Sequence, residues 1–206
     1  MDSVASLYGR NQLESLIADT AREVFIPITV GGGIRSVDDA KKILRAGADK
    51  VAINTAAIAS PILISEVAKK FGSQCMVLSI EAKRIDQNSW EAFTDGGRER
   101  SGLDVVDWAK KAVSLGAGEI LLTSVDNEGT GKGFDLDLIK AVSSEVNVPI
   151  IASGGFGEPR DAANAYVSSG ADAVAIAGAF HYKKISLSQI QETLKLWNIS
   201  FRAQRL

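Results

Sequence analysis

The sequence predicts an α/β fold in which helices cover a parallel sheet that closes into a barrel. Short apolar stretches of strand length alternate with stretches of helical spacing along the chain. The apolar stretches have apolar residues on both faces, as in parallel strands buried from both sides. Glycine and polar residues repeatedly follow strand ends, and no Gly-x-Gly-x-x-Gly pattern follows the first strand. These last two features favour a closed barrel over an open doubly wound sheet.

The elements are predicted in the following order. Strands are expected where the apolar runs occur, over 25–30, 51–54, 75–80 and 120–125, and within 149–157 and 170–180. Helices are expected over 12–24, 36–47, 60–71, 103–115, 136–146 and 187–197, with one more between the last two strands. Ser36 is a predicted N-cap, and glycines at 47, 72 and 116 end three of the helices. Residues 90–93 are expected to leave the sheet as an excursion, with a turn at 95–97.

The chain contains an internal repeat. Pro27 and the strand and glycines after it match Pro149 onward, 122 positions later, and Gly-Ala-Asp at 47–49 matches Gly-Ala-Asp at 170–172. Each half of the fold is therefore about four strand–helix units long, as in a (β/α)8 TIM barrel with twofold symmetry. The strand over 75–80 has no counterpart, because its match falls before residue 1. The sequence therefore holds about strands 3 to 8, with the tip of strand 2 at Met1 and Asp2.

We expect residues 1–206 to form a single (β/α)8-type barrel domain that is incomplete at its N-terminus. About 45 residues, containing strand 1, helix 1 and most of strand 2, are expected to be missing. A fragment is favoured over a six-stranded barrel because an unclosed parallel sheet exposes two unpaired edges.

Composition excludes several classes of function. The formal net charge of −2 gives no reason to expect nucleic acid or an anionic membrane as a partner. No apolar run approaches the roughly 20 residues that span a bilayer, and a cytoplasmic location is expected. The single cysteine and single histidine form no metal-binding pattern, so neither a metal nor another cofactor is expected. Cys75 is predicted to be a buried structural thiol, and His181 to be structural.

The duplicated glycines predict two phosphate-binding sites at the carboxyl ends of the strands. Backbone N–H groups approach a phosphate closely at glycine, and a helix N-terminus adds a favourable dipole. One site combines Gly32 and Gly33 with Asn54 and Thr55. The residues of the second site are Ser153, Gly154, Gly155, Ala177 and Gly178. Two such sites indicate a substrate phosphorylated at both ends; the alternative is that the glycines serve only tight turns.

Five stretches carry a resemblance to a known family. They are Val-Gly-Gly-Gly-Ile-Arg-Ser-Val (30–37), Gly-Ala-Asp-Lys-Val-Ala-Ile-Asn-Thr-Ala-Ala (47–57), Phe-Gly-Ser-Gln-Cys (71–75), Gly-Ala-Gly-Glu-Ile-Leu-Leu-Thr-Ser (116–124) and Ile-Ala-Ser-Gly-Gly (151–155). This set resembles the cyclase subunit of imidazole glycerol phosphate synthase. The resemblance implies a lyase of histidine biosynthesis. It would use ammonia from a glutaminase to convert a bis-phosphorylated ribulosyl aminoimidazole carboxamide nucleotide into imidazole glycerol phosphate and AICAR.

The resemblance also implies the catalytic residues, with three departures. The family uses two aspartates as acid and base; the first lies in the segment expected to be missing, and Glu81 stands at the second. The family's second phosphate loop implies Glu128 and Gly129 as binding residues, where Glu128 replaces an aspartate. Gly178 stands where a serine is usual. The departures resemble a divergent branch linked to surface-sugar amidation, so the alternative function is an ammonia-conducting scaffold that binds and activates a glutaminase.

The resemblance implies that the opposite end of the barrel contacts the glutaminase partner. Lys50 and Glu119 each precede the apolar run of a strand, which places both at the barrel floor. In the family such residues belong to a charged ring that gates ammonia entry, and Asp49 matches a residue that faces the glutaminase in a heterodimer. The alternative for Lys50 and Glu119 is a solvated salt bridge, worth under about 1 kcal/mol.

Overall fold

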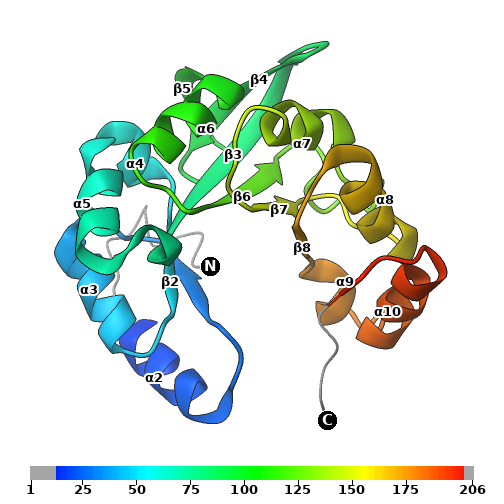
Figure 1. Ribbon diagram of the computed structural model, residues 1–206, viewed down its shortest axis with the longest axis horizontal. Helices are drawn as coiled ribbons and strands as arrows, with labels where there is room; N and C mark the ends of the chain where they lie inside the picture. The colour runs from blue at the N-terminus through cyan, green and yellow to red at the C-terminus, as the bar shows by residue number, and fades with distance from the viewer. Residues whose placement is uncertain (1–12, 202–206) are drawn as a thin grey trace.

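The structure is a computed structural model that describes residues 13–201. Six parallel strands form one sheet in the order β1-β2-β3-β6-β7-β8. They are β1 (Thr29–Gly31), β2 (Lys50–Ile53), β3 (Met76–Asp86), β6 (Glu119–Ser124), β7 (Ile150–Ser153) and β8 (Ala173–Ala175). The sheet curls with its helices on the outside and stays open between β8 and β1 (Figure 1). The prediction of an α/β barrel that is incomplete here is confirmed; the predicted tip of strand 2 lies outside the described residues.

Helices follow the strands of the described chain; seven of them were predicted, whereas the two short helices at 55–59 and 178–181 were not. The helices are α2 (Leu13–Glu23), α3 (Val37–Arg45), α4 (Thr55–Ala59), α5 (Ile62–Phe71), α6 (Val105–Ser114), α7 (Leu136–Ser143), α8 (Pro159–Ser169), α9 (Gly178–His181) and α10 (Leu187–Leu196). Ser36 caps α3 as expected, because its hydroxyl accepts the backbone N–H of Asp39 at 3.1 Å. Within residues 13–201, no helix combines the length and the apolar character that crossing a membrane requires.

The second half of β3, from Glu81 on, forms one arm of an antiparallel hairpin. Strand β3 pairs antiparallel with β4 (Ser89–Thr94), which pairs antiparallel with β5 (Glu99–Asp104). The predicted excursion is therefore confirmed. The helix expected from Leu103 begins two residues later, because the Asp104 carboxylate accepts the N–H groups of Val106 and Asp107 and caps α6.

Two local predictions are wrong. The strand expected over 25–30 covers only Thr29–Gly31, and the Phe25 side chain is 92% exposed. The reason is that β2 begins opposite Thr29, at Lys50, so the residues before Thr29 have no neighbouring strand to pair with. Cys75 is half-buried rather than buried, because it lies in the short 3₁₀ helix η1 (Ser73–Cys75) just before β3 enters the sheet.

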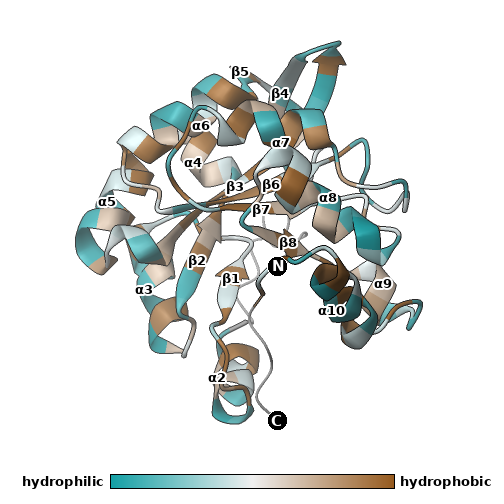
Figure 2. Ribbon diagram, turned by 45° about the vertical axis from the view of Figure 1, so that its right-hand side comes forward, coloured by the Kyte–Doolittle hydropathy of each residue, from teal (hydrophilic) through white to brown (hydrophobic). Residues whose placement is uncertain are grey.

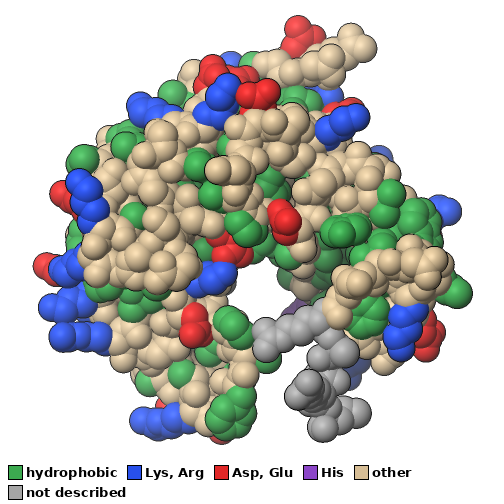
Figure 3. All heavy atoms as spheres, viewed as in Figure 1, with side chains coloured by type: hydrophobic (Ala, Val, Ile, Leu, Met, Phe, Trp, Pro, Cys, Tyr) green, Lys and Arg blue, Asp and Glu red, His purple; other side chains and the backbone are tan. Residues whose placement is uncertain are grey.

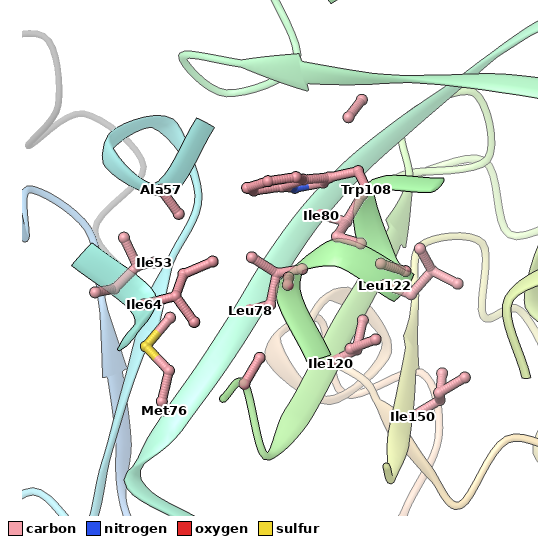
Figure 4. Close-up of a cluster of buried hydrophobic side chains, with 14 of the residues drawn as sticks. Ile53, Ala57, Ile64, Met76, Leu78, Ile80, Trp108, Ile120, Leu122 and Ile150 are labelled. Carbon is pink, nitrogen blue, oxygen red and sulfur yellow. The ribbon is translucent and has the colours of Figure 1, made fainter. Parts of the chain in front are cut away.

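The main core lies between the sheet and the helices outside it. Alternate residues of neighbouring strands supply large apolar side chains that are fully buried, including Leu78 and Ile80 of β3 and Ile120 and Leu122 of β6. Trp108 of α6 joins the same cluster, which Figure 4 shows in close-up. Figure 2 shows the apolar colour concentrated along the central strands. This core fixes β3 and β6, two of the strands whose carboxyl ends carry the site.

Candidate active site

A cavity of about 350 Å³ opens at the carboxyl ends of the strands. In the space-filling view of Figure 3 a gap is open near the centre of the molecule. The cavity is lined by residues of β2, β3, β6 and β7 and of the loops after β1, β2, β4 and β6: Gly32, Gly33, Ile34, Ala52, Ile53, Asn54, Thr55, Ser79, Glu81, Gly96, Leu121, Thr123, Val125, Glu128 and Ser153. Seven of the predicted site residues therefore lie around one space: Gly32, Gly33, Asn54, Thr55, Glu81, Glu128 and Ser153.

Glu81 is the most perturbed acidic group of this cavity. Its Oε2 accepts a hydrogen bond from the Gly97 backbone N–H at 2.7 Å and another from Asn54 Nδ2 at 3.1 Å. Burial raises the pKa of the Glu81 carboxyl above its usual value, the hydrogen bonds from Gly97 and Asn54 oppose the rise, and the charge of Asp95 adds to it. A carboxyl group with a raised pKa holds its proton closer to neutral pH, as a general acid requires.

Asn54 and Thr55 connect the end of β2 to the hairpin. Asn54 is the N-cap of α4, and its Nδ2 also donates to the Phe93 carbonyl at 3.0 Å. Its Oδ1 is buried and has no hydrogen-bond partner within the described residues. The Thr55 hydroxyl accepts the Asp95 N–H at 3.1 Å. Both side chains thus hold the turn between β4 and β5 over the cavity.

The loop after β6 is tied down at both ends. The Asp126 carboxylate accepts the Arg84 N–H at 2.7 Å, which fixes the start of the loop to β3. Asn127 Nδ2 donates to the Gly133 carbonyl at 2.9 Å and closes the loop on itself. Glu128 lines the cavity, whereas its neighbour Gly129, with φ of 73°, does not.

The second predicted phosphate site is only partly brought together. Ser153 lines the cavity, but Gly154, Gly155, Ala177 and Gly178 do not. A Cβ on Gly155 would stand 2.1 Å from the Gly133 carbonyl oxygen, and the Gly133 N–H donates to the Gly155 carbonyl at 2.8 Å. Close packing of two loops therefore accounts for this glycine. Ala177 and Gly178 are exposed at the start of α9.

The floor residues form direct contacts. Lys50 Nζ and Glu119 Oε2 form an ion pair across the start of β3, because β3 lies between β2 and β6 in the sheet. Their side chains are 30% and 13% exposed, so the pair is more buried than the solvated salt bridge of the alternative prediction. Asp49 is exposed, and its Oδ2 accepts the Ile28 N–H at 2.7 Å.

Several lining residues were missed by the sequence reasoning. Ser79 lies two positions before Glu81 on β3, and Leu121, Thr123 and Val125 alternate along and after β6. Residues two apart in a strand share a face, so this alternation was the available signal. Gly96 carried no such signal, because the hairpin brings it to the cavity from outside the sheet. No group of three or more His, Cys, Asp or Glu within residues 13–201 is placed to hold a metal ion.

Comparison with known proteins agrees with this geometry. The family described as "Histidine biosynthesis protein" matches residues 1–186. The chain belongs to this family. Three relatives each carry the name "Imidazole glycerol phosphate synthase subunit HisF". The Legionella pneumophila protein is 67% identical over 158 residues, which cover 77% of this chain and 74% of the relative.

The other two relatives align over nearly the whole chain. The Alkaliphilus metalliredigens protein is 45% identical over 98% of this chain and 80% of its own length. The Lachnoclostridium phytofermentans protein is 50% identical over 99% of this chain and 80% of its own length. Membership of the family therefore rests on similarity along nearly the whole chain and not on the glycine motifs alone.

Proposed function

We propose that this protein is the cyclase subunit of imidazole glycerol phosphate synthase, a lyase of histidine biosynthesis. Its reaction joins ammonia to a bis-phosphorylated ribulosyl aminoimidazole carboxamide nucleotide and releases imidazole glycerol phosphate and AICAR. The relatives that carry this name support the assignment. The observation that carries it is a single cavity that joins the Glu81 carboxyl to the glycine-rich end of β1 and to Ser153 of β7.

The cavity suits an anionic substrate through its backbone. No lysine or arginine is among the described residues that line it, so a phosphate would be bound by N–H groups at Gly32 and Gly33 and at the start of α4. Asn54 and Thr55 stand at that helix start. Protonation of Glu81 removes one negative charge from the cavity and supplies the proton for general acid catalysis.

We assign the second phosphate to the other side of the cavity. Ser153 and the loop of Glu128 and Gly129 support this assignment by their position beside β6 and β7. Gly154, Gly155, Ala177 and Gly178 would contribute backbone groups only. This end is therefore the weaker of the two, because it offers fewer side-chain donors.

We further propose a glutaminase partner at the barrel floor. The relatives are named as one subunit of a synthase, which supports an assembly with a second protein. Asp49 and the Lys50–Glu119 ion pair lie at the amino ends of β2 and β6, opposite the cavity. Ammonia released at this end would reach Glu81 through the barrel. The cytoplasmic location stays a prediction.

The test is an assay of the purified full-length protein with the nucleotide and an ammonium salt. Turnover is expected, and Glu81→Gln should reduce kcat by roughly 10²–10⁴, the usual contribution of a general acid or base. Unchanged turnover in Glu81→Gln would remove Glu81 from its role. Stimulation of the glutaminase without any turnover would instead favour the scaffold alternative, which the names of the relatives do not favour.

A further inference from the structure

The turn between β4 and β5 lies against the Glu81 carboxyl, although no sequence motif connects the two. Asp95, Gly96 and Gly97 all adopt positive φ angles, of 51°, 72° and 75°. Two hydrogen bonds hold this backbone in place. The Asp95 N–H donates to the Thr55 hydroxyl at 3.1 Å, and the Gly97 N–H donates to Glu81 Oε2 at 2.7 Å.

The two oxygens of Glu81 are in unequal surroundings. Oε2 accepts from both Gly97 and Asn54, whereas none of these hydrogen bonds within the described residues ends on Oε1; the Gly96 backbone N–H also favours the charged form of the carboxyl group. A carboxyl group held in this way has a fixed orientation, and one of its oxygens stays available to the cavity that Glu81 lines. The N–H donors on Oε2 would also stabilise the carboxylate after the proton has left.

We propose that the β4–β5 turn is a positioning device for Glu81, in which Gly97 and Asn54 hold Oε2, Oε1 exchanges the proton with substrate, and Asp95 acts on the carboxyl group through its charge. In the acid step the Oε1–H bond breaks and the proton moves to a basic atom of the substrate, which leaves a carboxylate. Asp95 and Gly97 are thus positioning residues. The inference rests on the proposed function, because it takes Glu81 to exchange a proton with substrate.

The charges around Glu81 agree with this role for Asp95. After burial, the negative charge of Asp95 also raises the pKa of Glu81. Other charged side chains on the elements around Glu81 include Lys83 of β3, whose Nζ lies over the Phe93 ring, and Asp126, which accepts the Arg84 N–H. Arg98 lies in the same turn and Glu128 across the cavity, and Glu91 of β4 is paired with Arg100. Replacing Asp95 by a neutral residue should therefore lower the pKa of Glu81.

The decisive variant is Asp95→Asn, because asparagine keeps the side-chain shape and tolerates the left-handed backbone while it removes the charge. The matched control is Glu99→Gln, an exposed carboxylate on β5 of the same hairpin. The readout is a ¹³C-carboxyl NMR titration of the full chain, with the Glu81 signal identified by its loss in Glu81→Gln. The Glu81 midpoint should move to lower pH in Asp95→Asn and stay unchanged in Glu99→Gln. An unchanged midpoint in Asp95→Asn, or an equal shift in the control, would overturn the proposal.

A second variant tests the geometry of the turn. Gly97→Ala strains a backbone at positive φ and places a Cβ 3.1 Å from Val125, so the Gly97 N–H should move away from Glu81. We expect kcat to fall about 10- to 100-fold while KM changes less than about twofold, since a misplacement of about 1 Å costs turnover rather than binding. A raised KM with unchanged kcat would contradict this. If the unsubstituted full-length protein shows no turnover, the proposed function fails, whereas a Glu81 midpoint that still moves in Asp95→Asn keeps the role of the turn.

Discussion

The two halves of the repeat share a backbone design and differ in what they offer the cavity. In both halves the strands pair in the same register, Thr29 with Lys50 in the first and Ile151 with Ala173 in the second. In both, an aspartate three residues after the N-cap accepts backbone N–H groups just before the helix, Asp39 for α3 and Asp161 for α8. The repeat has therefore preserved the devices that start helices and align strands.

The difference lies at the helix start that follows the second strand of each half. Asn54 and Ala177 occupy equivalent N-cap positions with similar φ angles, −119° and −114°. Asn54 reaches Glu81 and the hairpin, whereas Ala177 has no group that could do so. One backbone frame therefore carries a side chain that contacts Glu81 in one half and no such side chain in the other. Four predictions test this contrast, from the largest expected effect to the smallest.

Gly155→Ala should be the most damaging of these substitutions. Its Cβ would clash with the Gly133 carbonyl oxygen at 2.1 Å, at a residue with φ of 107°. We expect the free energy of unfolding to fall by roughly 2–4 kcal/mol from the forced backbone shift and strain. Gly178→Ala is the control, because nothing lies within 4 Å of its added Cβ, and it should stay within about 0.5 kcal/mol. Urea denaturation measures both, and equal losses would refute the packing role of Gly155.

Substitutions at the two equivalent N-cap positions should have unequal effects on stability and on kcat. Asn54→Ala removes the donor to Glu81 and to the Phe93 carbonyl and should cost about 1–3 kcal/mol of stability, together with a loss of kcat. Ala177→Asn should change stability by less than about 0.5 kcal/mol and leave kcat unaltered. Denaturation and steady-state kinetics check both variants. Similar effects at the two positions would show that the halves are functionally alike.

The strand-aligning aspartates should, by contrast, behave alike in stability. The Asp49 carboxylate accepts the Ile28 N–H at 2.7 Å, and Asp172 accepts the Ile150 N–H at 2.9 Å. Replacing either by alanine should cost about 1–2 kcal/mol, the contribution of a hydrogen bond to an exposed charged group. Glutaminase stimulation should be lost only in Asp49→Ala. Equal stimulation by the two variants would count against an interface at Asp49.

The pH dependence of stability should show the smallest effect. The pKa of Glu81 is raised in the folded chain, so the folded state binds the Glu81 proton more tightly than the unfolded state does. The stabilisation that the protonated Glu81 carboxyl contributes is present at pH below about 4 and is lost as the pH rises through the pKa of Glu81 in the folded chain. Glu81→Gln should therefore gain stability relative to the unsubstituted chain as the pH is raised from 4 to 8. A difference that stays constant over this range would show that the carboxyl does not titrate as described.

The sequence predicted the strands and helices that carry the site better than the contacts between its side chains and loops. Apolar runs, caps and stop glycines located nearly every element, because these signals act within a few residues. The repeat placed Gly32, Gly33, Asn54 and Thr55 at one end of the barrel, and they line the cavity. The hydrogen bond from Gly97 to Glu81 could not be predicted. It depends on how a hairpin folds back onto the sheet, and a turn glycine 16 positions after Glu81 carries no periodic signal.

The contact between Gly133 and Gly155 limits how the cavity rim can change. The loop after β6 and the turn after β7 are joined by a backbone hydrogen bond, and a side chain at Gly155 would meet the Gly133 carbonyl oxygen. A Cβ at Gly157 would likewise meet the Gly131 carbonyl oxygen at 2.1 Å. The two segments are thus a single module of the rim. A designer who grafts a new loop after β6 to accept another substrate has to transplant the β7 turn with it.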